Sequence, residues 1–577
     1  MRKGWKSGGS AIALTLLLPG ISLAEGRAEL PRAPLESEIP LDWAAPAIPH
    51  APAPAMAEPP APMPLDWQAP DISAEIADEK TRSRIESIFL AGTAPAMEAG
   101  RLEAITAFYA ARQYRPLWSE NGAWSDNATA AFDRIAKAAD DGLDPAAYKL
   151  PAPPSKDADT LALADIELSA AVVAYATEAE GGRIEPRSIS PLLTAKPEKP
   201  DAGEVLDKVS GARDVAGVLD SFNPSHDGFR KLRVKLAELR RTAKTHETLP
   251  VVEKGKLIRP GMQDPRVPVL RARLGLPTAQ DTTYDSALAD AVREFQRSKG
   301  LNDEAVVGNL TITALNEEIS ADPVADILVN MERWRWLPRD LGRRHVFVNI
   351  PEFHAWVMED GSAIHDTRVV VGTPANQTPV FSDAIQFLIV NPYWNVPYSI
   401  ASKEMLPRLQ QDPTYLARQG IEVVHVRGNR RRVLDSTAID WNNVSLKGLY
   451  FRQPPGERNA LGNIKFMFPN EHAVYLHDTP SRSLFGRSSR AFSHGCVRVE
   501  DPFALAEVLL GVENGWSKEK VKRLIGGSER RINLKTPVPV HLAYFTAFVD
   551  DGNTLKTHKD IYGHDSRMRA ALGLAGH

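Results

Sequence analysis

The chain has 577 residues, of which 43% are apolar and 25% charged, and it carries a net charge of −4 at pH 7. This is the composition of ordinary globular domains of roughly 100–200 residues each, and the charge gives no reason to expect a nucleic-acid partner. The single cysteine, Cys496, excludes a disulfide within the chain and argues against zinc or iron–sulfur sites, which need several thiolates. We therefore expect no metal and no other cofactor.

The first 24 residues have the order of a secretory signal peptide: a basic start, an apolar run at 11–18 and a small-residue cleavage site at Ala24. The run is shorter than the roughly 20 residues that span a bilayer, and Pro19 breaks it, which argues against an uncleaved anchor. No later stretch is expected to be apolar enough to cross a membrane. We expect an exported protein that contacts the membrane only if the signal is uncleaved.

Residues 25–78 are rich in proline and alanine, and they repeat the phrase PLDW at 40–43 and 64–67. So many prolines disfavour helix and central strand, and the composition is typical of an extended, semi-rigid linker. The repeated tryptophan is open to a docking role, but apolar punctuation within a spacer is the simpler interpretation.

Two helical units follow the linker. Residues 79–250 carry apolar residues at spacings of three and four, which predicts an all-helical scaffold domain, and no catalytic constellation is visible in it. Residues 258–318 form a smaller unit, in which stripes such as Val267 with Leu270 and Leu288 with Val292 predict three short helices around a small core.

The smaller unit is similar to the peptidoglycan-binding domain 1 family. The stretches YDSALADAVREFQRSKGL and VVGNLTITALN carry the resemblance, which includes Phe295-Gln296 and Leu315-Asn316. Membership implies binding to the bacterial cell wall. Most of the matching residues are also what any three-helix core needs, so the match supports the fold more strongly than it supports binding to the cell wall.

After a helix that ends in MERWRWLP (331–338), the apolar period changes from 3.6 to 2, which predicts a mostly β domain over residues 322–556. Asp360-Gly361 between two alternating runs is a strong hairpin signal. Residues 400–460 interrupt this domain with a polar, helix-leaning insertion, which is either a lid over a site or structural filler. Residues 557–577 are expected to be a C-terminal tail.

Cys496 lies in the segment AFSHGCVRVE, residues 491–500. A lone cysteine is ordinarily a small buried hydrophobe. Here an exported location, a neighbouring Gly495 and two nearby histidines, His477 and His494, favour a nucleophile. A catalytic cysteine needs a nearby histidine to lower the thiol pKa and donors for the developing oxyanion.

The order of residues also predicts how the thiol is presented. A strand ending at His477, a connecting loop and a returning segment at Cys496 would place His477 alongside the thiol. Gly495 has no side chain, so backbone N–H groups can approach a substrate carbonyl closely. Asp501-Pro502 is an N-cap followed by a first-turn proline, which predicts a helix directly after the strand that carries the cysteine.

The motif of His477 followed by Ser493-His494-Gly495-Cys496-Val497-Arg498 resembles the catalytic domain of the L,D-transpeptidase (YkuD) family. Further stretches, among them NPYWNVPYSI, YLHDTPSRSLF and DIYGHD, resemble its long, periplasmic, YcbB-like members. The resemblance covers residues 90–565. It implies a multidomain α+β fold: a YkuD-like β-sandwich with an inserted capping subdomain, an all-helical scaffold domain and a three-helix peptidoglycan-binding domain.

The same resemblance implies the roles of the central residues. Cys496 would attack the carbonyl of the L-centre of meso-diaminopimelate in a tetrapeptide stem and expel the terminal D-Ala. His477 would accept the thiol proton and return it to the leaving amine. Backbone N–H groups at Gly495 and Cys496 would hold the oxyanion, and Tyr475, which shares a strand face with His477, could assist. An acceptor amine would then resolve the thioester into a 3→3 cross-link.

Several neighbouring residues have more than one reading. Arg498 can hold a substrate carboxylate or serve as a structural salt-bridge partner, and Trp394 can wall the donor site or belong to the core. Ser493 and His494 are placed with the substrate contacts, and for His494 a packing or supporting role is favoured over that of general base. Asp478 should point away from His477, since adjacent strand residues face opposite sides, so a backbone carbonyl is expected to orient the imidazole.

Three functions are compatible with these observations. The first is an exported, periplasmic L,D-transpeptidase that remodels peptidoglycan and that a carbapenem would acylate. The second is an L,D-carboxypeptidase or a transferase that attaches a protein to the wall. The third is a non-catalytic wall-binding scaffold, against which the presence of both His477 and Cys496 argues. The expected partners are the donor and acceptor stem peptides of peptidoglycan.

Overall fold

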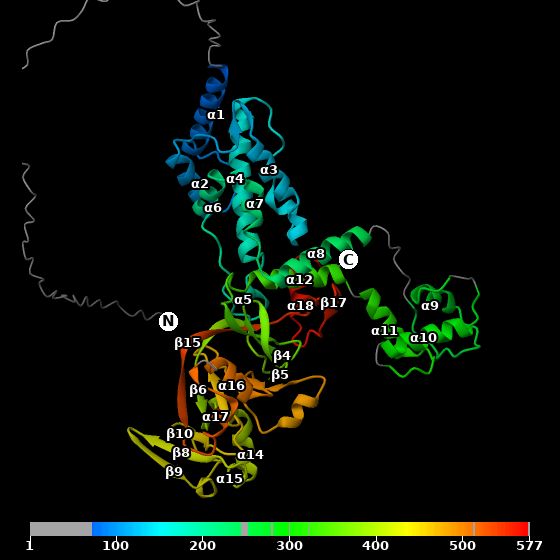
Figure 1. Ribbon diagram of the computed structural model, residues 1–577, viewed down its shortest axis with the longest axis vertical. Helices are drawn as coiled ribbons and strands as arrows, with labels where there is room; N and C mark the ends of the chain where they lie inside the picture. The colour runs from blue at the N-terminus through cyan, green and yellow to red at the C-terminus, as the bar shows by residue number, and fades with distance from the viewer. Residues whose placement is uncertain are drawn as a thin grey trace, which may run out of the picture. The chain divides into compact units, whose positions relative to one another are not determined.

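A computed structural model describes residues 72–243, 252–277, 281–298, 301–320, 322–511 and 514–574 (Figure 1). The expected signal peptide, residues 1–24, and most of the expected linker, residues 25–71, lie outside the described residues. Within the described part, helices occupy the region before residue 336 and strands dominate the region that follows.

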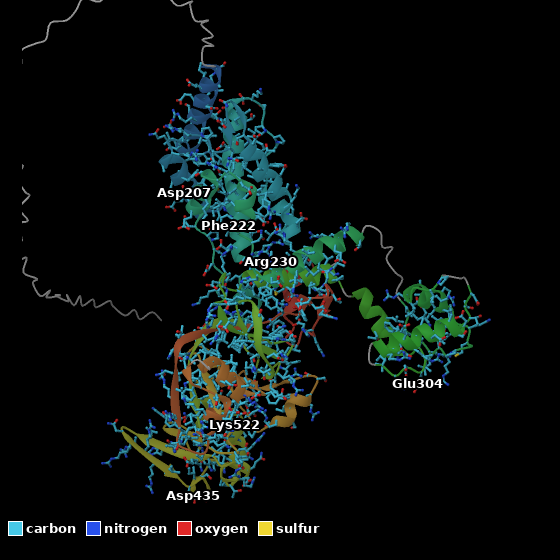
Figure 2. The ribbon with its side chains drawn as sticks, viewed as in Figure 1. Asp207, Phe222, Arg230, Glu304, Asp435 and Lys522 are labelled. Atoms are coloured by element: carbon cyan, nitrogen blue, oxygen red, sulfur yellow. The ribbon has the colours of Figure 1, made fainter. Side chains whose placement is uncertain are left out.

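The helical region begins with a bundle that has its own core. Its helices are α1 (Ile72–Leu90), α2 (Ala99–Ala111), α3 (Asp126–Ala136), α4 (Ala158–Gly181), α5 (Pro186–Ile189), α6 (Ala202–Ser210) and α7 (Val215–Asp220). α4 lies at the centre of the bundle, and most of its residues are buried. Phe222, which follows α7, belongs to the same core and is labelled at the lower end of the bundle in Figure 2. Around α4 the core buries aromatic side chains such as Trp118 and Tyr109.

One expectation about this region needs correction. By length and composition α4 is apolar enough to span a membrane, although no stretch after the signal was expected to be. The reason is its place in the bundle: 72% of its most apolar window is buried inside the protein, so the apolar surface serves the core of the domain.

The small unit after residue 252 consists of α9 (Val267–Arg273), α10 (Ser286–Ser298) and α11 (Asn309–Ser320) around a separate core. Gln296, from the motif that matches the peptidoglycan-binding family, is buried among them. Its side-chain amide donates to Val306 O at 2.9 Å and to Thr311 Oγ1 at 3.0 Å, and its carbonyl accepts from Ala305 N at 3.1 Å. This glutamine therefore fixes the loop before α11.

The region from residue 344 contains a nine-stranded mixed sheet in the order β13-β5-β14-β12-β11-β6-β15-β3-β4. Its strands are β3 (Arg344–Asn349), β4 (His354–Glu359), β5 (Ser362–Gly372), β6 (Phe381–Val390), β11 (Ile464–Met467), β12 (Leu476–His477), β13 (Ala491–Ser493), β14 (Val497–Val499) and β15 (Arg530–Ala543). A further β4–β5 pairing closes the sheet around the main core. The expected multidomain α+β fold with a mostly β catalytic region is confirmed.

Two local predictions in this region are confirmed as well. Asp360 and Gly361 have φ of +49° and +79° and form the tight turn between β4 and β5, as two-residue hairpins require. Asp501 caps α16 (Pro502–Leu510) by accepting from Ala504 N, so a helix follows directly after β14.

A helix and a C-terminal segment flank the sheet. In α12 (Pro323–Arg335), the buried carboxylate of Glu332 accepts from the backbone N–H groups of Arg183 and Ile184, at 2.6 and 2.8 Å, and so fastens the segment after α4. Residues 557–574, expected as part of a tail, include α18 (His564–Ala571). Its Met568 is fully buried in the main core, because His564, Met568 and the following Leu572 recur every four residues and so share one buried face.

The capping insertion is a subdomain inserted between β6 and β11, with a core of its own. Its elements are β7 (Trp394–Asn395), α13 (Tyr398–Ile400), η3 (Ala401–Met405), α14 (Leu406–Gln411), α15 (Tyr415–Arg418), β8 (Glu422–Arg427), β9 (Arg430–Leu434), η4 (Ser436–Ala438) and β10 (Leu449–Gln453). The strands form a separate sheet in the order β7-β10-β8-β9 (Figure 1).

Candidate active site

The pairing of β12 with β14 places the two expected catalytic residues on one face of the sheet. The strands run parallel, with Leu476 beside Val497 and His477 beside Arg498. Leu476 and Val497 are fully buried in the main core. Since side chains alternate along a strand, Cys496 and His477 lie on the opposite face as diagonal neighbours. The expectation that the returning chain brings His477 alongside the thiol is confirmed.

This face opens into a cavity of about 440 Å³. Seven of the residues predicted from the sequence line it: Trp394, Tyr475, His477, Ser493, His494, Cys496 and Arg498. The remaining predicted residue, Gly495, lies between two lining residues. The cap contributes further wall residues that the sequence did not single out, among them Ile400, Lys403 and Glu404.

His477 is held by the backbone beside it. Its Nδ1 donates to the carbonyl oxygen of Asp478 at 2.5 Å, which leaves Nε2 as the acceptor nitrogen. The carboxylate of Asp478 faces the other way and accepts from Asn463 N and Thr479 N, at 2.9 and 2.7 Å. The expected backbone orientation of the imidazole is confirmed, and a Cys-His-Asp triad is not formed.

Burial, together with the positive charges of Arg498 and Lys465, lowers the pKa of His477 to about 3. The imidazole is therefore neutral at pH 7. Its ring packs edge-on against Tyr475, with the centroids 5.7 Å apart. Lys465 lies directly opposite His477 on β11, and no motif in the sequence pointed to this lysine.

The pKa of the Cys496 thiol is raised, mainly by burial, although the backbone of Tyr475 and the charge of Arg498 oppose the rise. This differs from the expectation that a nearby histidine lowers the thiol pKa. The physical reason is that His477 is neutral and offers no positive charge, while both groups are desolvated. The resting site is a neutral thiol beside a neutral imidazole, and no hydrogen bond joins their side chains in the described structure.

The loop before the cysteine is tightly fixed. Gly495 has φ of +111°, a conformation that side chains rarely adopt. Its carbonyl accepts from Thr378 Oγ1 at 2.8 Å, and Thr378 N in turn donates to the hydroxyl of Tyr562 at 3.1 Å. The Tyr562 hydroxyl donates to Gly372 O at 2.8 Å, so a residue 66 positions after Cys496 secures this loop.

The same loop changes the expected oxyanion site. Gly495 N–H donates to Ser493 Oγ at 3.1 Å, and Ser493 Oγ donates to Cys496 O at 2.5 Å. Ser493 is almost fully buried and acts as a brace of the loop. Among the described residues the N–H of Cys496 has no acceptor, so it is the donor that remains available to an oxyanion beside the thiol.

Two cations on this face, Arg498 and Lys465, have no carboxylate partner in the part of the chain that the structure describes. Arg498 forms no ion pair with any described residue, and its buried Nε has no hydrogen-bond acceptor. The ammonium of Lys465 lies 5.8 Å from the centre of the Tyr475 ring, and burial lowers its pKa. Of the two readings of Arg498, the structural salt bridge is not formed in the described structure. A buried, unpaired guanidinium favours binding of an anionic ligand.

The cap is joined to the nucleophile loop by a hydrogen bond. His494 Nε2 lies 2.9 Å from Glu404 Oε1, and each side chain is nearly half exposed. His494 therefore contacts the cap beside the cavity that both residues line. A packing or supporting role had been favoured for this histidine. Glu404 precedes it by 90 residues, so no local pattern indicated this contact.

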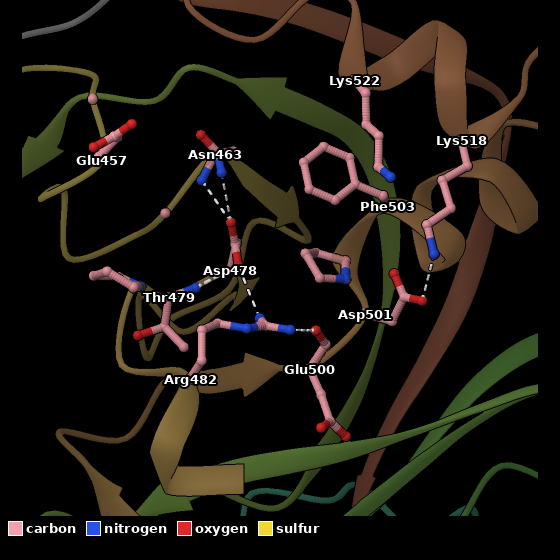
Figure 3. Close-up of a pocket in the computed structure, with 14 residues that line it drawn as sticks. Glu457, Asn463, Asp478, Thr479, Arg482, Glu500, Asp501, Phe503, Lys518 and Lys522 are labelled. Atoms are coloured by element: carbon pink, nitrogen blue, oxygen red, sulfur yellow. Dashed lines mark hydrogen bonds and ion pairs between the residues drawn. The ribbon is translucent and has the colours of Figure 1, made fainter.

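A second and larger cavity, of about 850 Å³, lies behind the same strands (Figure 3). It contains none of the predicted catalytic residues, and most of its charged groups are paired. Figure 3 shows Asp478 bonded to Asn463 and Arg482, and Lys518 bonded to Asp501 at 2.7 Å. Arg482 also donates to the carbonyl oxygen of Glu500.

Comparisons with known proteins agree with this geometry. Residues 343–540 match the family described as "L,D-transpeptidase catalytic domain" (YkuD), and residues 270–315 match the "Putative peptidoglycan binding domain". Residues 103–236 match the family described as "Scaffold domain". These three matches fall on the β region, the small helical unit and the helical bundle.

A protein of Haemophilus influenzae named "Putative L,D-transpeptidase" is 38% identical over 248 residues. The alignment covers 42% of this chain and 49% of that protein, so the chain spans about half the length of the curated relative. A solved L,D-transpeptidase fragment from Xylanimonas cellulosilytica is 16% identical and covers 50% of this chain and 98% of its own, with a TM-score of 0.14. The Ldtfm-avibactam carbamoyl enzyme is 12% identical, covers 44% of this chain and 81% of its own, and has a TM-score of 0.16.

Proposed function

Residues 343–540 are an L,D-transpeptidase catalytic domain of the YkuD family, and from this premise we propose that the chain is an exported, periplasmic cysteine L,D-transpeptidase that forms 3→3 cross-links in peptidoglycan. The observation that carries the proposal is the cavity in which Cys496, His477 and the unpaired Arg498 meet. It offers a nucleophile, a neutral base and an anion-binding group on one sheet face.

The first half of the reaction forms a thioester. As Cys496 Sγ attacks the L-centre carbonyl of a tetrapeptide stem, the thiol proton passes to His477 Nε2 and the carbonyl becomes an oxyanion near Cys496 N–H. The intermediate collapses when the C–N bond to the terminal D-Ala breaks, and the leaving nitrogen takes the proton from His477. A neutral base suits this step, because the raised thiol pKa leaves little thiolate at rest.

The second half transfers the acyl group. The side-chain amine of an acceptor stem attacks the thioester, His477 accepts a proton from that amine, and the C–S bond breaks. The departing thiolate recovers the proton from His477. Arg498 and Lys465 supply positive charge for the carboxylates that a stem peptide carries. The unit at 270–315, which matches a peptidoglycan-binding family, would hold the polymer during both halves.

The test is product analysis by mass spectrometry after incubating the chain, without residues 1–24, with disaccharide tetrapeptides. We expect tripeptide–tetrapeptide dimers and released D-Ala, and we expect neither with Cys496→Ala. Tripeptides without dimers would instead identify an L,D-carboxypeptidase, and stems attached to an added protein would identify a wall-anchoring transferase. Absence of any turnover would leave the non-catalytic scaffold.

Two smaller measurements address the remaining parts of the proposal. A carbapenem should add its mass to the wild-type chain once and not at all to Cys496→Ala, because the chain has a single thiol. Export with cleavage near Ala24 should appear as a periplasmic product whose mass lacks the first 24 residues. A full-length cytosolic product would contradict export.

A further inference from the structure

The hairpin formed by β8 and β9 concentrates positive charge at the edge of the cap sheet. It carries four exposed arginines: Arg427, Arg430, Arg431 and Arg432. Arg427 and Arg430 are direct cross-strand partners, and like charges in that position repel and destabilise a sheet. We call this segment, residues 427–432, the arginine hairpin.

Two other arginines of the cap form ion pairs, and among the described residues those of the arginine hairpin do not. Arg452 lies 2.7 Å from Glu422, and Arg418 is bonded to Asp412. In contrast, none of the hairpin arginines forms an ion pair with a described residue. The carboxylate nearest in sequence, Asp435, accepts instead from Thr437 N at 2.9 Å and caps η4 (Figure 2). The protein therefore leaves this repulsion uncompensated.

The cap sheet connects the arginine hairpin to the active-site cavity. Its first strand, β7, carries Trp394, which lines the cavity, and β10 and β8 lie between β7 and the edge strand β9. Figure 1 shows β10, β8 and β9 together in the cap. With roughly 4.8 Å between neighbouring strands, β9 lies about 15 Å from β7. The register of this sheet also places Arg432 four residues and Arg430 six residues along the strands from the level of Trp394, which adds about 13 and 20 Å. The hairpin therefore lies roughly 20–25 Å from Trp394, farther than the about 14 Å of one extended four-residue stem, so contact with it requires a further stem of the same polymer.

We propose that the arginine hairpin is an exosite that binds the carboxylates of neighbouring stem peptides on the same peptidoglycan polymer. The inference rests on the proposed function and names how its substrate is recognised beyond the reacting stem. Guanidinium groups match carboxylates in geometry, and several exposed contacts add up when the ligands are joined in one chain. A single stem would occupy the cavity without contacting the hairpin.

The test compares two substrates with one variant, R427Q/R430Q/R431Q/R432Q. With a single disaccharide tetrapeptide as donor and acceptor, we expect the variant to keep kcat/KM within about twofold of the wild type, because these contacts are not made. With glycan strands that carry many stems, we expect kcat/KM about tenfold lower and a weaker dependence on salt, as for several exposed ion pairs.

A matched control removes four exposed cations of the helical bundle, R115Q/K137Q/K156Q/R213Q, and so changes the net charge equally. It should behave as the wild type on both substrates. Equal losses on the two substrates, or no loss on the polymer, would overturn the exosite. So would a variant that reacts normally with the polymer but no longer binds phosphatidylglycerol vesicles, since the hairpin would then be a membrane contact.

Binding at the exosite can also be measured without turnover, so its test is independent of the proposed function. In a Cys496→Ala background, co-sedimentation with purified sacculi should be about tenfold weaker when the arginine hairpin is neutralised than when the bundle control is. If the wild-type chain is inactive and this difference persists, the proposed function fails and the exosite stands. If the chain is active and the difference is absent, the exosite fails alone.

Discussion

The two cavities on either side of residues 477–478 differ in a way that size does not reveal. His477 lines the smaller one, of about 440 Å³, and Asp478 lines the larger one, of about 850 Å³. In the larger cavity most charges are satisfied by partners within the protein. In the smaller one the thiol of Cys496 and the guanidinium of Arg498 are partly buried without an ion-pair partner among the described residues, and the imidazole of His477 is held by a backbone carbonyl alone. Groups left unpaired at a cost in stability mark the site of chemistry better than volume does.

The strongest test of this contrast removes the nucleophile. Cys496→Ala should lower turnover of tetrapeptide donors by at least about 10⁴-fold, since no other thiol is present, while far-UV circular dichroism stays unchanged. Mass spectrometry of released D-Ala measures the effect. Persistent turnover would show that the smaller cavity is not the reacting site.

His477→Gln should be the next largest in effect, with kcat about 10³-fold lower, because the amide retains hydrogen bonding but cannot accept the thiol proton. Cys496 should remain open to alkylation by iodoacetamide at high pH, which shows that the thiol is still present in the cavity. A rate near that of the wild type would assign the base to another group.

Arg498→Gln should lower kcat/KM by about 10- to 100-fold, mostly through KM, since it removes a charged contact to a carboxylate. The melting temperature should not fall, because the guanidinium has no ion-pair partner to lose within the described structure. Arg498→Lys should recover part of the activity. A lower melting temperature with unchanged kinetics would make the arginine a structural residue.

The buried imidazole should also make the catalytic domain sensitive to acid. In the unfolded chain His477 takes up a proton near pH 6.5, whereas in the folded protein its pKa is about 3, so stability falls as pH drops from 6.5 toward 3. Its share of the free energy of unfolding should be about 2 kcal/mol lower at pH 5 than at pH 8. Calorimetry of wild type against His477→Gln isolates this share, which is absent if the pH dependence is identical in both.

The smallest effect on catalysis is expected on the other side of the strand. Asp478→Asn should destabilise the catalytic domain by about 1–2 kcal/mol, because its carboxylate accepts several backbone and side-chain donors in the larger cavity. Turnover should stay within about threefold, since the carbonyl rather than the carboxylate orients His477. A loss as large as that of His477→Gln would mean that the two cavities work as one.

The sequence predicted the parts of the site that depend on local order. Strand alternation placed Asp478 away from His477, and the loop length brought Cys496 back beside it. Contacts between distant segments, such as Glu404 with His494, were not predictable because no local period records which strands become neighbours. The direction of the thiol pKa was missed for a related reason, since burial is a property of the assembled fold.

The donors of the oxyanion site also could not be fully predicted from the sequence, although the residues involved lie within four positions of one another. The motif placed Gly495 and Cys496 together as backbone donors, but it did not show that the Ser493 hydroxyl occupies one of them. The Ser493 hydroxyl bonds both Gly495 N and Cys496 O, and only the conformation of the loop determines these two partners. Lys465 was missed because it reaches the face through the pairing of β11 with β12, which joins two strands of unrelated motifs.

The bond from Tyr562 to the loop of Thr378 and Gly495 has a consequence for the order in which the protein matures. A ribosome makes the nucleophile loop 66 residues before it makes the tyrosine that secures it. A nascent chain that already contains Cys496 therefore holds its thiol in a loop without its final support. The hydrogen bonds that fix this loop are therefore complete only after synthesis has passed the tyrosine.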